Sequence, residues 1–179
     1  MDPDDIAVDV DSSSIEFTLS SFLKPWDADD PEAYSCEIRG KIITHDDQDK
    51  EVPLGEIELL LVKTADAICD GAELAFIFDA VGLDDPWIAL FAEEGSCPEL
   101  AVQFSENDIL FIGKVSVEEK YQGTSLRIRA IQTAVAMFLP VGTVIVHCDL
   151  LTDAEWSRFG GRQIPETDYI CVRSPLAHP

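Results

Sequence analysis

Residues 117–127 constrain the fold of this chain more than any other segment. They close an apolar, β-branched run that predicts a strand, turn at Gln122 and Gly123, and then open a run with helical periodicity. A strand that enters a helix through a tight turn directs several backbone N–H groups at one point, and the helix dipole adds partial positive charge there. The segment therefore predicts an anion site of the kind that binds a phosphate or pyrophosphate.

The apolar pattern predicts further strands and helices on both sides of this turn. Strands are expected at residues 14–23, 33–44, 54–62, 109–117, 143–148 and 169–173, the second and third joined by a polar turn at 45–51. Helical segments are expected at residues 67–81, 85–91 and 125–139, and in a short helix that Asp153 caps and Gly160 ends. One apolar stripe in the helix at 125–139 is formed by Leu126, Ala130, Ala134 and Phe138.

Length and composition predict one folded domain. The chain has 179 residues, of which 46% are hydrophobic, enough for one buried core at residues 14–179. Residues 1–13 are rich in Asp and Ser and are expected to form an acidic, disordered tail. No apolar run reaches the ~20 residues of a membrane span, and the acidic start is unlike a targeting signal. These features favour a cytoplasmic protein without a membrane segment.

The net charge of −23 is distributed unevenly. Residues 1–108 contain 28 Asp and Glu against 5 Lys and Arg, whereas residues 109–179 contain 7 of each. The part at 14–108 is therefore acidic, and the part at 109–174 is balanced. Nucleic acid binding is disfavoured because phosphates need a basic surface. A cationic substrate or a basic protein partner is favoured, and solubility alone is the other explanation of the charge.

The cysteines and histidines do not predict a metal site. The five cysteines are widely spaced without a CxxC pair, which indicates reduced and mostly buried thiols. The three histidines, His45, His147 and His178, do not combine with them at the spacing of known zinc sites.

Residues 117–127 read Val-Glu-Glu-Lys-Tyr-Gln-Gly-Thr-Ser-Leu-Arg. This turn resembles the acyl-CoA-binding turn of the GNAT acetyltransferase superfamily, whose pattern Val117, Tyr121, Gln122 and Gly123 match. Ser125 and Arg127 stand where the family has Gly or Ala. The order strand, turn, helix, strand, short helix, strand over about residues 105–174 is also similar to that of the family.

The resemblance implies a fold, a cofactor and a set of contacts. The fold is α/β (α+β), with a mixed, mostly antiparallel twisted central sheet flanked by helices. The co-substrate is acetyl-CoA, whose pantetheine arm would lie along the strand at 109–117 in a V-shaped splay from the strand at 143–148. The residues implied in cofactor binding are Val115, Val117, Gln122, Gly123, Thr124, Ser125, Leu126 and Arg127.

The implied activity is acetyl transfer from acetyl-CoA to the amine of a cationic small molecule or protein. This reaction needs a base for the amine, and Glu118, Glu119 and His147 are the candidates, with Asp149 beside His147. It also needs an acid for the departing thiolate. The family often has a Tyr there, but this chain has Trp156, so Ser157 is the candidate substitute.

Two other functions remain open at this point. One is a GNAT-like fold without catalysis, which acts as a binding or regulatory protein. The other is an acidic protein that blocks a basic, nucleic-acid-binding partner. The resemblance does not identify the acceptor, because the family has helices between its first two strands, whereas this chain has helical sequence at residues 64–95.

Overall fold

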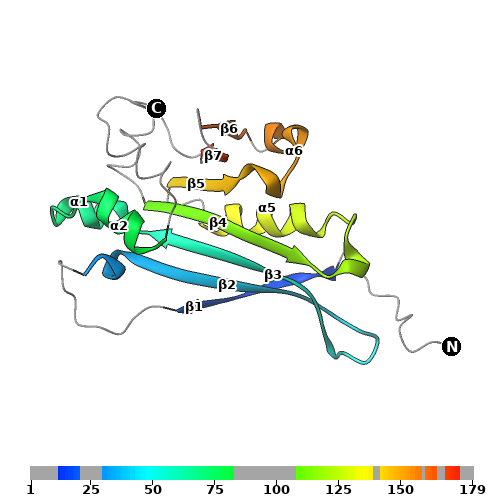
Figure 1. Cartoon of the computed structure of the whole chain (residues 1–179). Coiled ribbons are helices and arrows are strands. Elements are labelled where there is room, and N and C mark those ends of the chain that lie inside the picture. The colour runs from blue at the N-terminus through cyan, green and yellow to red at the C-terminus, as the bar shows by residue number, and fades with distance from the viewer. Residues whose placement is uncertain are drawn as a thin grey trace.

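The structure of the protein is a computed structural model (Figure 1). It describes residues 12–20, 30–82, 108–138, 142–158, 160–164 and 168–173. Residues 1–11 of the expected tail, residues 21–23 of the first expected strand and the expected helix at 85–91 lie outside these ranges.

Within the described ranges, seven strands form one sheet in the order β1-β2-β3-β4-β5-β7-β6. The strands are β1 Ser14–Ser20, β2 Ser35–His45, β3 Glu51–Val62, β4 Asp108–Val117, β5 Gly142–His147, β6 Arg162–Gln163 and β7 Tyr169–Arg173. Every neighbouring pair is antiparallel except β4 and β5, which are parallel. The expected α+β chain with a mixed, mostly antiparallel sheet is therefore confirmed.

The helical elements lie in the connections between the strands. The α-helices are α1 Thr64–Cys69, α2 Leu74–Ala80, α5 Leu126–Phe138 and α6 Asp153–Arg158. The 3-10 turns are η2 Pro31–Tyr34, η3 Glu119–Tyr121 and η5 Cys148–Leu150. None of the helices in the described ranges has the length and apolar character that crossing a membrane requires.

The helix α5 covers one face of the sheet. It connects β4 to β5, because parallel neighbours need a long crossover that a hairpin cannot supply. Its buried residues are Leu126, Ala130, Ile131, Ala134 and Val135, and they pack against Leu110, Ile112, Val144 and Val146 of the sheet. Phe138 at the end of the expected stripe is only partly buried, with its ring 5.5 Å from that of Phe17 in an edge contact.

The opposite face of the sheet is covered by η2, α1 and α2. A second cluster of buried residues on this face contains Ile109, Phe111 and Ile145 from the sheet, with Tyr34 and Phe78 from the covering elements. The rings of Phe78 and Phe111 lie 6.2 Å apart at 74°. Successive side chains of a strand point to opposite faces, so this face is the one on which His147 lies, two residues after Ile145.

Three local expectations are corrected by the structure. The single helix expected at 67–81 is two helices, because the chain reverses at Gly71 with a φ of 77°. The strand β6 was missed, because two residues carry too little pattern to be recognised. Asp153 is the first residue of α6, and Thr152 takes the cap position: its carbonyl accepts from the Trp156 N–H, and its own N–H donates to Glu155.

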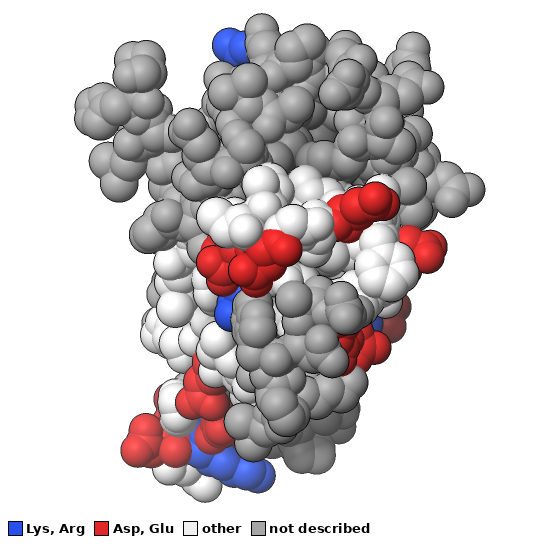
Figure 2. All heavy atoms as spheres, turned by 90° about the vertical axis from the view of Figure 1, so that its left-hand side faces the viewer, with Lys and Arg blue, Asp and Glu red and all other residues white. Residues whose placement is uncertain are grey.

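Carboxylates gather at the end of the molecule that α1 and α2 form (Figure 2). The exposed acidic residues of these helices and their connection are Asp66, Asp70, Glu73 and Asp79, and residues 64–82 contain no Lys or Arg. Four of the acidic residues of the N-terminal part thus lie together at this end.

Candidate functional site

The strands β4 and β5 pair along only half of β4. Their pairs run from Asp108 with Gly142 to Ile112 with Val146, and β4 then continues to Val117 beside β3 alone. Gly113 is the extra residue of a bulge in β4, since Glu58 pairs with Lys114 and Leu59 already pairs with Ile112. A bulge bends its strand, so we call residues 113–117, which leave β5 here, the splay.

The splay has a free backbone edge on the side of β5. The Glu118 N–H donates to the Leu54 carbonyl at 2.9 Å, so Glu118 turns its backbone polar groups toward β3. Alternation along the strand then directs the N–H and C=O groups of Val115 and Val117 toward the β5 side. Among the described strands, none pairs with this edge beyond Ile112. The side chain of Val115 is buried and that of Val117 is partly buried, so these two residues offer their backbone.

Local hydrogen bonds fix the conformation of the turn after the splay. Gly123 has a φ of 89°, a conformation that other residues rarely adopt, and an added Cβ would meet nothing within 4 Å. The Thr124 hydroxyl donates to the Tyr121 carbonyl at 2.7 Å and accepts from the Leu126 N–H at 3.4 Å. The helix α5 begins after Ser125, whose carbonyl accepts from the Arg129 N–H at 2.9 Å.

Four backbone N–H groups around this helix start have no acceptor within the described part of the chain. They belong to Gly123, Ser125, Arg127 and Ile128. Such groups, together with the dipole of the 13-residue α5, favour an anion.

The predicted cofactor-binding residues differ in whether their side chains are accessible to a ligand. The side chains of Gln122, Thr124, Ser125 and Arg127 are exposed. Leu126 is an exception, because its side chain is in the core and its N–H is engaged by Thr124.

The positive charge of Arg127, near the start of α5, acts on Glu155 of α6. The pKa of Glu155 is lowered, first by the Thr152 N–H and then by the Thr152 hydroxyl, which donate to its carboxylate at 2.7 and 2.8 Å. The charges of Arg127 and Arg158 lower the pKa further. Arg127 is thus exposed at the start of α5, and its charge lowers the pKa of a carboxylate on α6.

Trp156 is part of the core and does not replace the family's Tyr as an acid. Its side chain is 3% exposed, and Nε1 donates to the Cys148 carbonyl at 3.3 Å. Ser157, the expected substitute, is exposed on α6. The sequence alone could not distinguish a buried Trp156 from an exposed one, because a Trp fits either face of a short amphipathic helix.

The candidate bases lie in two separate places. Glu118 and Glu119 are exposed at the far end of the splay, where the Glu118 carboxylate is 3.6 Å from the Lys120 ammonium. His147 follows the last parallel pair, so it is level with Gly113. The two places are about five residues apart along β4, or roughly 17 Å at ~3.3 Å per residue. The structure therefore does not bring the glutamates and His147 together.

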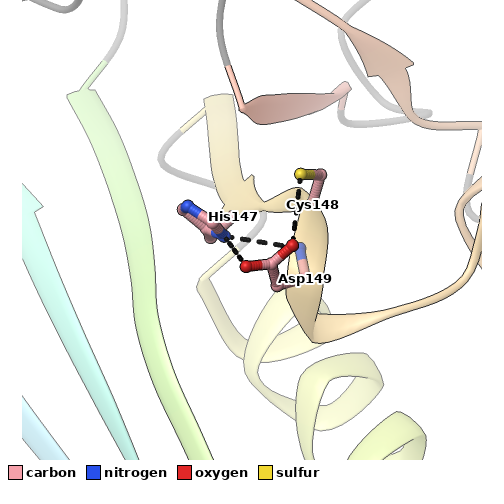
Figure 3. Close-up of side chains that lie close together, drawn as sticks. All are labelled: His147, Cys148 and Asp149. Carbon is pink, nitrogen blue, oxygen red and sulfur yellow. Dashed lines mark hydrogen bonds and ion pairs between the residues drawn. The ribbon is translucent and has the colours of Figure 1, made fainter.

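Tyr169 and Asp149 contact His147. The His147 ring meets the Tyr169 ring edge to face, with centroids 5.3 Å apart. Its Nδ1 accepts the Asp149 N–H at 3.3 Å (Figure 3). The Asp149 carboxylate lies between the ring and the Cys148 thiol, with Oδ2 3.5 Å from Nδ1 and Oδ1 3.7 Å from Sγ.

The sequence predicted no metal-binding group, but the structure brings His147, Cys148 and Asp149 together. Ligand atoms of the three residues lie within 4.8 Å of one another. Strand alternation had placed His147 and Cys148 on opposite faces, but β5 ends at His147 and the 3-10 turn η5 begins with Cys148. Three consecutive ligand residues after a fully apolar strand were the signal available in the sequence.

A cavity of about 240 Å³ lies on the same face of the sheet as His147. Gly113 and Phe111 of β4 line it, together with Glu37 of β2, Glu58 of β3 and Arg39. Because Gly113 is level with His147, the cavity borders the start of the splay. Both carboxylates are in exposed ion pairs, Glu37 with Arg39 at 3.4 Å and Glu58 with Lys114 at 3.3 Å, so a cationic occupant would have to compete for them.

Comparisons of the chain with protein-family models, with curated proteins and with solved structures found no match.

Proposed function

We propose that the protein is an acyl-CoA-dependent N-acetyltransferase that transfers an acetyl group to the amine of a cationic small molecule or protein. The observation that carries the proposal is the parting of β4 from β5 after Ile112 and Val146, which leaves a free strand edge leading to the N-terminus of α5. A strand edge suits an extended amide-containing arm, and a helix start suits a pyrophosphate. Acetyl-CoA combines these two groups in one molecule.

In this proposal the cofactor runs from the turn to the start of the splay. The free N–H groups of Gly123, Ser125 and Arg127 receive the pyrophosphate, and the exposed side chains of Gln122 and Thr124 lie beside it. The pantetheine amides bond to the backbone of Val115 and Val117. The thioester then lies near Gly113.

The cavity beside Gly113 receives the amine acceptor. The amine would displace Arg39 or Lys114 from the exposed carboxylates of Glu37 and Glu58. His147, level with Gly113, takes the proton that the amine must lose. The amine nitrogen forms a bond to the thioester carbonyl carbon, the C–S bond breaks, and the CoA thiolate takes a proton from solvent. Glu118 and Glu119 are close to the pyrophosphate in this arrangement, so His147 is the favoured base.

A protein that binds acyl-CoA without turnover is the second candidate. The buried Trp156 favours it, because the indole N–H is committed to the Cys148 carbonyl and offers no proton to a thiolate. Binding and turnover must therefore be measured separately.

A third candidate function, the blocking of a basic protein, is supported only by the acidic end of the molecule. Asp66, Asp70, Glu73 and Asp79 are exposed there without a Lys or Arg among residues 64–82. This function predicts a salt-sensitive complex with a basic protein, and it fails if affinity capture at low salt recovers none.

Calorimetric titration with acetyl-CoA tests the proposed site. We expect micromolar binding that Gly123→Trp abolishes, since the new side chain would fill the space at the turn. Gly71→Trp is the matched control, because Gly71 also has a positive φ and open space around it but lies between α1 and α2. Absence of binding at millimolar acetyl-CoA would refute the proposal.

Release of free CoA thiol in the presence of a polyamine then separates the two candidates. For the enzyme we expect His147→Ala to keep acetyl-CoA binding and to lower the turnover rate by roughly 10²–10⁴-fold. Binding without any thiol release from a panel of amines would favour the inactive protein.

A further inference from the structure

The end of β5 carries three side chains of the kinds that hold transition metals. His147 offers an imidazole nitrogen, Cys148 a thiol and Asp149 a carboxylate, and these ligand atoms lie within 4.8 Å of one another. In Figure 3 all three are directed toward a common point beside the strand end. A continuing strand would separate them, but the 3-10 turn η5 brings Cys148 and Asp149 to the side of His147.

We propose that His147, Cys148 and Asp149 form a binding site for a divalent transition-metal ion, with Zn²⁺ as the ion that fits best. Imidazole nitrogen, thiolate sulfur and carboxylate oxygen are all ligands of zinc, and the set differs from the all-oxygen sites of Mg²⁺ and Ca²⁺. Three protein ligands leave one position of a tetrahedral ion open for water.

Two of the three distances between the ligand atoms are close to those in zinc sites, and the third, between His147 and Cys148, is within 4.8 Å. Tetrahedral zinc bonds of ordinary length separate a nitrogen from an oxygen by about 3.4 Å and a sulfur from an oxygen by about 3.6 Å. The corresponding distances are 3.5 Å from Nδ1 to Oδ2 and 3.7 Å from Sγ to Oδ1. The Asp149 side chain is 83% exposed, so its carboxylate is free to rotate until one oxygen faces both neighbours.

The groups around the ligands support this arrangement. Tyr169 holds the plane of the His147 ring, and Trp156 holds the carbonyl of Cys148. The ion would take the Nδ1 lone pair that now accepts the Asp149 N–H, a long hydrogen bond of 3.3 Å. The Cys148 thiol would release one proton to the buffer as its sulfur binds the ion.

Metal binding has a consequence that rests on the proposed function. The ion takes the imidazole lone pair that the proposed base needs, so the metal-bound protein should not turn over. The metal site itself is measured without acetyl-CoA, so its failure and that of the transferase are distinguishable.

Titration of the full chain with Co²⁺ tests the site through its absorption. We expect one ion per chain, a sulfur-to-metal charge-transfer band, and displacement of the ion by Zn²⁺. An excess of Mg²⁺ is present throughout, because a chain with a net charge of −23 attracts cations without a site. Release of one proton per ion, measured by calorimetry in buffers of different ionisation enthalpy, gives a second readout.

Variants identify the ligands. Cys148→Ser should remove the charge-transfer band and lower the affinity for Zn²⁺ by more than roughly tenfold, since loss of even an outer partner costs about that much. His147→Gln and Asp149→Asn should each weaken binding. Cys69→Ser, at an exposed cysteine on α1, and Cys97→Ser are controls that should keep both band and affinity. An unchanged band in Cys148→Ser, or no band in the parent protein, would overturn the proposal.

Discussion

The indole Nε1 of Trp156 donates a hydrogen bond of 3.3 Å to the backbone carbonyl of Cys148. This bond joins the buried face of α6 to the turn η5, which carries His147, Cys148 and Asp149. Trp156, which the sequence indicated as a departure in chemistry, therefore supports the turn that carries these three side chains.

Trp156→Phe should destabilise the protein by roughly 1–3 kcal/mol. The change removes the indole N–H, leaves the Cys148 carbonyl without this donor and reduces the volume of a side chain that is 3% exposed. Chemical denaturation measures the free energy of unfolding. Phe76→Leu is the control, because Phe76 is 56% exposed and its replacement should change this energy by less than about 0.5 kcal/mol. Equal effects of the two variants would show that the bond contributes nothing.

Gly55→Ala should cost about 1–3 kcal/mol, whereas Gly113→Ala should change stability by less than about 0.5 kcal/mol. A Cβ on Gly55 would collide with the backbone carbonyl of Ser116, which cannot move without breaking the pairing of β3 with β4. A Cβ on Gly113 would meet only the Glu58 carbonyl at 3.9 Å. Thermal unfolding of the two variants side by side measures the difference, and a reversed order would contradict the predicted collision.

Asp108→Asn should stabilise the protein at neutral pH, by up to about 1 kcal/mol. Burial raises the pKa of Asp108, and its Oδ1 is buried without a partner among the described residues. Because the folded state holds this proton more tightly than the unfolded state, stability falls as pH rises from the unfolded pKa of about 3.9 to the raised folded pKa. The free energy of unfolding of the variant minus that of the parent should therefore grow through this window and stay constant above it.

Asp47→Asn is the control for this pH dependence, since it removes the same charge from an exposed position in the turn between β2 and β3. A difference between Asp108→Asn and the parent that does not change with pH would disprove the assigned role of Asp108.

The four cysteines in the described part of the chain should react with iodoacetamide in a fixed order. Cys69 is exposed and should react first, Cys148 should follow slowly, and the buried Cys36 and Cys171 should react only on unfolding. Burial raises the pKa of Cys148, and the Asp149 and Asp168 carboxylates raise it further, so little reactive thiolate is present near neutral pH. Mass spectrometry of the labelled peptides gives the rates.

Asp149→Asn tests the cause of the slow reaction at Cys148. Removing the neighbouring charge should lower the pKa of the thiol and raise its alkylation rate several-fold, while the rate at Cys69 stays the same. An unchanged ratio of the two rates would show that the carboxylate does not influence the thiol.

The C-terminal half of the fold could be predicted because its elements are long and strongly patterned. The strand expected at 109–117 differs from β4 by one residue, and the strand expected at 169–173 has the bounds of β7. The helix expected at 125–139 was recognisable from its buried stripe and from Pro140. Short elements such as β6, and the break at Gly71, depend on contacts that no local pattern records.

The candidate site could be predicted only where the backbone determines it. The turn at Gln122 and Gly123 follows from local sequence, and its free N–H groups follow from the helix start. The separation of Glu118 from His147 depends on the register of β4 with β5, and the cluster at His147 depends on where β5 ends. Both features depend on tertiary structure. The sequence alone could therefore only propose Glu118, Glu119 and His147 together as candidate bases.

The partial pairing of β4 with β5 makes the sheet two units joined by a narrow seam. Strands β1 to β4 form one unit, β5 to β7 form the other, and five parallel pairs join them. Hydrogen exchange should find the backbone amides at this seam less protected than those between β2 and β3. A ligand bonded to the free edge of Val115 and Val117 would act as a short eighth strand, so its binding would also reinforce the seam and raise the melting temperature with ligand concentration.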